Sequence, residues 1–181
     1  NWGWPRDPGG DRLPPGWLYD PAKLRRVGNG VRWREQDVET GAAGQYLKYR
    51  EVFRCPEHYK NHRYQNDSRA ITSYLMNGCV SAFTADLSFQ VSRFIPDAVI
   101  FWEPPDPEGL GESGTGWYPE DWNDGSSTPD QGFSFRHGTN GATLGFIDGH
   151  VDWWSLGKYQ QTLENPLKNP LWCAPDSQNG R

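Results

Sequence analysis

The feature that most constrains this chain is the run from residue 133 to residue 154, near its C-terminal end. Asp148-Gly149 stands there between two apolar segments, and a two-residue type I′ turn needs the positive φ values that these residues tolerate. The dipeptide therefore predicts a β-hairpin in which Phe146 pairs with Val151. Because side chains alternate along a strand, this register collects the apolar residues on one face.

The same register sets Leu144 opposite Trp153. If residues 138–141 form a second turn, Phe135 falls opposite Leu144 on that face. We therefore expect residues 133–154 to form a three-strand β-meander with one buried side.

Composition limits the class of protein. The 181 residues fit a single domain, and 10 Trp among them supply much of the burial that its core needs. With 21 Gly and 15 Pro, long loops should connect short strands. The net charge of −5 argues against a nucleic-acid partner, because phosphate binding needs a basic surface.

Shorter patterns predict the remaining elements. Short helices are expected near residues 21–27 and 42–49, and strands near 51–55, 71–76 and 99–102. The expected fold is α+β: a small twisted antiparallel sheet that ends in the meander, short helices and long loops.

Two segments lack periodicity. Residues 1–19 read as an extended arm, and residues 104–132 as a long acidic loop. Oxygen ligands of the kind that Ca²⁺ takes gather in this loop, although a solvated acidic loop is the alternative and the spacing is not that of an EF-hand. These candidate calcium ligands are Asp121, Asn123, Asp124 and Asp130. Exposed aromatic rings can also stack on sugars, and the candidates in the loop are Trp117, Tyr118 and Trp122.

His137 is followed by ten residues and then by Asp148-Gly149. This motif resembles the prepilin-type processing-associated H-X9-DG domain of proteins built like type II secretion pseudopilins, with one extra residue that we assign to the 138–141 loop. Three upstream segments look like the family's segments in the family's order: residues 46–56, 73–78 and 95–103.

The resemblance implies the globular head of a pseudopilin-like structural subunit, in a secretion-linked or surface filament. Its partners would be other pilin-like subunits or further copies of itself, and its location extracellular or periplasmic. Many secretion pseudopilins carry a calcium ion in a late loop. The family anchors itself through an apolar N-terminal helix, which the sequence lacks, so we expect a processed or truncated globular part. The alternative function is a soluble extracellular binding module for polysaccharide.

An enzyme is not expected. In the meander, His137 and Asp148 lie at opposite ends of the central strand, about 17 Å apart, too far to share a proton. Asp148 is better explained as a turn residue, and His137 as a partly buried histidine bonded to loop backbone. No Ser-His-Asp elbow, P-loop or Rossmann glycine pattern occurs.

Three cysteines allow one disulfide in any of three pairings. The resemblance puts Cys55 directly after a strand, which favours a disulfide to Cys79. Cys55, His58 and His62 have a spacing that could hold zinc, but a structural site would need a fourth ligand.

Overall fold

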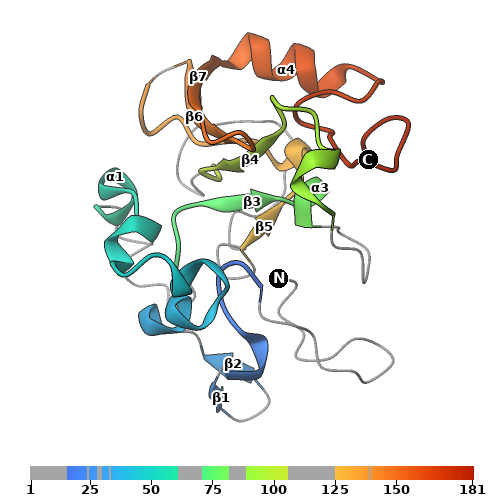
Figure 1. Ribbon diagram of the computed structural model, residues 1–181. Coiled ribbons are helices and arrows are strands. Elements are labelled where there is room, and N and C mark those ends of the chain that lie inside the picture. Colours follow the sequence, from blue (N-terminus) through green and yellow to red (C-terminus); the bar gives the residue numbers. More distant parts are fainter. Residues whose placement is uncertain are drawn as a thin grey trace. The chain divides into compact units, whose positions relative to one another are not determined.

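The computed structural model describes residues 16–23, 25–27, 30–32, 34–60, 71–81, 89–105, 125–138 and 140–181 (Figure 1). The chain divides into two compact units. The first unit consists of Asn1–Tyr74 and Glu120–Gly125, and the second of Leu75–Pro119 and Ser126–Arg181. No helix among these described ranges is long and apolar enough to cross a membrane.

A five-stranded sheet forms the second unit. Its strands lie in the order β5-β3-β4-β6-β7. Their bounds are β3 Leu75–Asn77, β4 Val99–Trp102, β5 Ser126–Ser127, β6 Gly141–Phe146 and β7 Val151–Ser155. The neighbouring pairs are antiparallel except that β5 runs parallel to β3, so the sheet is mixed. The predicted α+β class is confirmed, and so is the strand at 99–102.

Short helices complete this unit. They are α3 Gly78–Ser81, α4 Leu156–Glu164 and the 3₁₀ turns η5 Val91–Arg93 and η6 Pro129–Gln131. The hydroxyl of Ser155 caps α4 by accepting the backbone N–H of Lys158 at 3.2 Å. Tyr159 points from α4 into the core, where its ring meets that of Phe133 with centroids 4.3 Å apart. One buried aromatic residue thus fixes the helix against the sheet.

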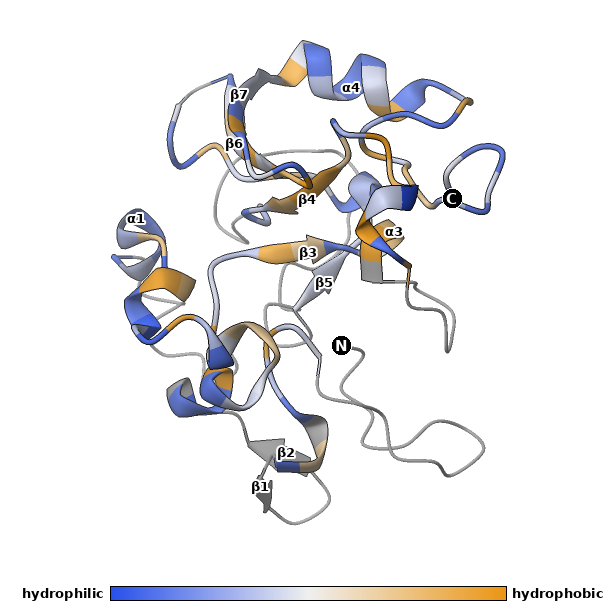
Figure 2. Cartoon of the chain, in the orientation of Figure 1, coloured by the Kyte–Doolittle hydropathy of each residue, from blue (hydrophilic) through white to orange (hydrophobic). Residues whose placement is uncertain are grey.

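The main core of the second unit lies on one face of the sheet. Its largest members come from β4, β6, β7 and α4 and include Trp102, Leu144, Phe146, Trp154 and Tyr159. Figure 2 shows strongly hydrophobic colour along β4, the central strand of the sheet. A smaller cluster combines Cys79, Phe94, Ala98, Trp172 and Cys173.

The predicted hairpin exists, but its register was wrong by one residue. The backbone N–H of Phe146 donates to the carbonyl of His150 at 3.0 Å, and that of Gly149 donates to Phe146 at 3.0 Å. Three residues, 147–149, therefore make the connection, and Gly149 has a φ of 92°. A three-residue loop that ends in a left-handed residue is the next commonest hairpin connection after the two-residue turn.

This shift exchanges the two faces of β7. Gly145 pairs with Val151 and Leu144 with Asp152. Trp154 is therefore buried at 4% exposure, while Trp153, expected in the core, is 48% exposed.

The third strand of the expected meander is absent. Residues 133–138 have no strand pairing, and β6 pairs with β4 instead. Phe133 is still buried and Phe135 packs against the same core, because the segment lies alongside the end of β4. The backbone N–H of Ser134 donates to the carbonyl of Glu103 at 2.8 Å.

The described part of the first unit consists mostly of short turns around a small core of Leu18, Tyr19, Val38, Phe53 and Ile71. Its elements are η1 Pro21–Lys23, β1 Arg25–Val27, β2 Gly30–Arg32, η2 Glu35–Thr40, η3 Ala43–Gln45, η4 Arg50–Phe53 and α1 Pro56–Tyr59. The helix expected at 21–27 ends at Lys23 because residues 25–27 pair with β2, and the strand expected at 51–55 is a 3₁₀ turn. Of the expected arm 1–19, only residues 16–19 are described.

Candidate functional site

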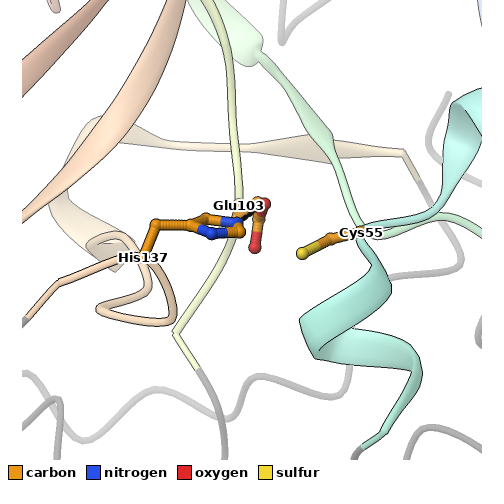
Figure 3. Close-up of side chains that lie close together, drawn as sticks. All are labelled: Cys55, Glu103 and His137. Carbon is orange, nitrogen blue, oxygen red and sulfur yellow. Dashed lines mark hydrogen bonds and ion pairs between the residues drawn. The ribbon is translucent and has the colours of Figure 1, made fainter.

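The most distinctive group of polar side chains lies where β4 ends. Glu103 follows Trp102, the last residue of β4, and is 7% exposed. Its Oε2 lies 2.7 Å from Nη1 of Arg136, and its Oε1 lies 3.0 Å from Nε2 of His137. Figure 3 shows the imidazole of His137 beside the carboxylate of Glu103.

Arg136 connects the 133–138 segment to the end of β4 through its side chain. Its Nη2 donates to the carbonyl of Pro104 at 3.2 Å, and its backbone N–H donates to the hydroxyl of Ser134 at 3.1 Å. The side chain is 6% exposed, so this ion pair is buried. Charge-assisted hydrogen bonds of this kind offset the desolvation of both groups, and removing one partner leaves a buried charge uncompensated.

The histidine side of the cluster reaches solvent, since the side chain of His137 is 40% exposed. A carboxylate can orient an imidazole for acid–base work. Both oxygens of Glu103 have partners in the 133–138 segment, Arg136 and His137, so the cluster ties this segment to the end of β4. Glu103 and His137 could supply two ligands to a metal, where a tetrahedral zinc site takes four.

Asp148 and His150 form a separate pair at the hairpin turn. Asp148 Oδ1 accepts the backbone N–H of His150 at 3.0 Å and lies 2.5 Å from its Nδ1. The backbone N–H of His150, followed by its side chain, lowers the pKa of the Asp148 carboxyl. The His150 ring stacks on Phe146 with centroids 4.1 Å apart. His137 thus bonds to Glu103, and Asp148 bonds to His150.

All three cysteines are buried and none is in a disulfide, so the expected Cys55–Cys79 disulfide is not formed in this structure. Cys79 instead has Cys173 as its thiol neighbour in the second unit. Cys55, which is also labelled in Figure 3, belongs to the first unit, where it precedes α1. His58 is buried, and His62, the other residue of the zinc pattern, lies outside the described residues.

Most residues named for the acidic loop also lie outside the described residues: Asp121, Asn123, Asp124, Trp117, Tyr118 and Trp122. Asp130 is described and lies exposed in η6. Calcium binding and sugar stacking by this loop therefore stay predictions.

Glu103 and Arg136 were missed in reasoning from the sequence. The signals available were a carboxylate directly after a predicted buried strand and a basic residue beside the motif histidine. Neither signal says that the two side chains meet, because 33 positions separate them along the chain.

Comparison with known proteins found no relative of this chain. No protein-family model, no curated protein and no solved structure matched the chain.

Proposed function

We propose that this chain is the globular head of a pseudopilin-like structural subunit, which works through contacts with other protein subunits. The observation that carries the proposal is the exposed apolar face of β7. This strand lies at the edge of the sheet, and Val151 and Trp153 on its outward face are 65% and 48% exposed. Tryptophan is enriched among the residues that supply most of the binding energy at protein–protein interfaces.

The Trp153 ring packs against the backbone of the neighbouring strand. A Cβ atom on Gly141 would come within 2.5 Å of the ring carbon Cζ2, so the indole lies directly against the backbone of β6. A ring ordered before binding loses little conformational entropy on association.

The contact would use side chains rather than strand addition. An edge strand with free backbone N–H groups can recruit another strand. At β7, however, Asp152 Oδ1 accepts the backbone N–H of Trp153 at 2.8 Å, and its Oδ2 accepts Trp154 Nε1 at 3.1 Å. This carboxylate both occupies a backbone donor and adds charge to the edge.

The motif residues would then have structural roles. His137 and Glu103 hold the segment before β6, and Asp148 with Gly149 shapes the turn between β6 and β7. Both parts support the hairpin that presents Val151 and Trp153. The resemblance to pseudopilin-like proteins supplies the kind of partner: pilin-like subunits or further copies of the chain.

Substituting the exposed face tests this function. Val151→Asp with Trp153→Asp, introduced into the full-length gene in its own bacterium, should abolish recovery of the protein in sheared surface filaments or in cross-linked subunit complexes. Gln160→Asp and Gln161→Asp are the matched control, because these α4 residues are exposed and polar. Normal assembly of the β7 variant, at wild-type protein level, would contradict the proposal, as would Trp153-dependent sedimentation of the head with polysaccharide alone.

A further inference from the structure

The second unit brings two thiols together from distant parts of the chain. Cys79 lies in the first turn of α3, directly after β3, and Cys173 lies near the C-terminus. Both are buried, at 2% and 1% exposure, in the cluster they share with Phe94, Ala98 and Trp172. Each thiol shifts the pKa of the other, so the two thiols lie close together.

The side chain of Asn77 fixes the backbone around both cysteines. Its Oδ1 accepts the backbone N–H of Cys79 at 3.0 Å. Its Nδ2 donates to the carbonyl of Leu171 at 2.8 Å and lies 3.8 Å from the sulfur of Cys173. Asn77 is fully buried, so its side-chain amide holds the start of α3 beside the segment that contains Cys173.

The segment before Cys173 is anchored independently. The backbone N–H of Val99 in β4 donates to the carbonyl of Pro170 at 2.9 Å. Asn169 Oδ1 accepts the backbone N–H groups of Leu171 and Trp172, both at 3.0 Å. These bonds fix where Cys173 lies without any covalent link.

We propose that Cys79 and Cys173 form a disulfide bond, which links the C-terminal segment covalently to α3. The oxidant is a molecule that itself carries a disulfide bond. Both cysteines belong to one compact unit and already meet in it. This pairing replaces the Cys55–Cys79 pairing that the family resemblance suggested. It does not depend on the proposed function, because the pairing follows from packing within the second unit.

The environment gives the two thiols different roles. The hydrogen bond from Cys173 lowers the pKa of the Cys79 thiol, and the backbone N–H groups of Cys173 and Ala174 act in the same direction. The same bond to Cys79, together with burial, raises the pKa of Cys173. In the closed unit Cys79 is therefore the thiol that ionises more readily.

The reaction is two successive thiol–disulfide exchanges. The thiolate of one cysteine attacks one sulfur of the oxidant, forming a mixed disulfide and expelling the oxidant's other sulfur as a thiolate. The other cysteine then loses its proton and attacks the sulfur of the first cysteine, which releases the second thiolate of the oxidant. The two cysteines lose two protons and two electrons, and the oxidant's disulfide is reduced to two thiols. Because both cysteines are buried, the exchange takes place while the C-terminal segment is open, as during folding.

The test is to refold the purified chain in a buffer of reduced and oxidised glutathione, quench it with acid, and alkylate it in denaturant without reductant. We expect one alkyl group per chain, on Cys55, and a cross-linked peptide containing Cys79 and Cys173. Cys55→Ser should leave no alkylated cysteine, whereas Cys79→Ser and Cys173→Ser should each leave two. Three alkylated cysteines in the wild-type chain, or a cross-linked peptide containing Cys55, would overturn the proposal.

A stability measurement separates a specific bond from incidental oxidation. Closing a loop of roughly 95 residues should raise the Tm of the oxidised chain above that of the reduced chain by about 10 °C. The comparison uses one sequence in two redox states, so it needs no variant that could fail to fold. Cys55→Ser should keep this difference and Cys79→Ser should lose it. Equal Tm values for oxidised and reduced wild-type chain would show that the bond does not fit the native packing and would refute the site.

Discussion

The rings of Phe146 and Trp154 lie with their centroids 5.8 Å apart on the buried face of the β6–β7 hairpin. The three-residue connection at 147–149 brings them together, because it pairs Ala142 with Trp154 and turns Trp153 outward. One residue of register thus decides which tryptophan stabilises the core and which is available to a partner.

Trp154→Ala should destabilise the chain by about 3–5 kcal/mol, because it removes a large side chain from a packed core. Trp153→Ala, the neighbouring substitution of the same type, should cost about 1 kcal/mol or less, since half of the ring is in solvent. Urea unfolding of both variants measures the difference. If Trp153→Ala proved the more damaging, the hairpin would have the two-residue register expected from the sequence.

Gly149→Ala should cost about 1 kcal/mol, because a Cβ atom disfavours its φ of 92°. No atom lies within 4 Å of the Cβ that the substitution adds, so the cost comes from the backbone alone. Gly157→Ala is the matched control: it has equally open space but lies in α4, where alanine is favoured. Thermal unfolding should give a lower Tm for the first variant and an unchanged or higher Tm for the second. A Gly149→Ala variant as stable as the parent would argue against the left-handed turn.

Glu103→Gln should destabilise the chain by about 3 kcal/mol, because Arg136 would keep its charge in a buried site without a carboxylate. The control is Asp176→Asn, which removes an exposed ion pair with Arg93 and should change the free energy of unfolding by less than about 0.5 kcal/mol. The double substitution of Glu103 and Arg136 by leucine should lower the free energy of unfolding by less than the sum of the losses from Glu103→Leu alone and Arg136→Leu alone. Additive losses would mean that the two side chains do not interact.

Tyr159 should make the second unit sensitive to high pH. Its hydroxyl donates to the carbonyl of Pro129, and burial, with a smaller contribution from Asp130, raises its pKa. A raised folded-state pKa stabilises the protein fully below the unfolded tyrosine value, near pH 10, and this stabilisation declines as the pH rises above it.

Tyr159→Phe should therefore cost about 1 kcal/mol at pH 7, because it removes a buried hydrogen bond to the Pro129 carbonyl, which keeps only the backbone N–H of Gly132 as a donor. The deficit should shrink above about pH 10. Tyr49→Phe, at a position 72% exposed, is the control and should change little at either pH. Unfolding in denaturant at pH 7 and above pH 10 measures both effects. A deficit that stays constant across this range would show that Tyr159 titrates normally.

Local signals predicted some elements well. The run Val99–Trp102 contains β-branched and aromatic residues after a turn, and it forms β4 with those bounds. The position of the hairpin was correct too, because Asp148-Gly149 favours a turn in any register. The number of loop residues was not predictable from the dipeptide, since two- and three-residue turns both accept glycine with positive φ. Helix α4 could have been predicted, because Leu156, Tyr159 and Leu163 repeat at helical spacing.

The candidate site was less predictable than the fold. His137 was identified, but Glu103 and Arg136 were not, because their contact depends on how β4 ends beside the 133–138 segment. Cys79 and Cys173 are equally non-local: 94 positions separate them, and only the shared core brings them together. Composition and spacing describe single segments, so contacts between segments had to come from the structure.

The central claim is that the outward face of β7 contacts another subunit. The most direct measurement is site-specific photo-cross-linking in the cells that make the protein, with the photoreactive residue at position 153 and, as control, at position 160. We predict cross-links from position 153 to a second copy of the chain or to a pilin-like protein, identified by mass spectrometry, and none above background from position 160. Equal labelling at the two positions, or cross-links from position 153 only to proteins unrelated to pilins, would contradict the account.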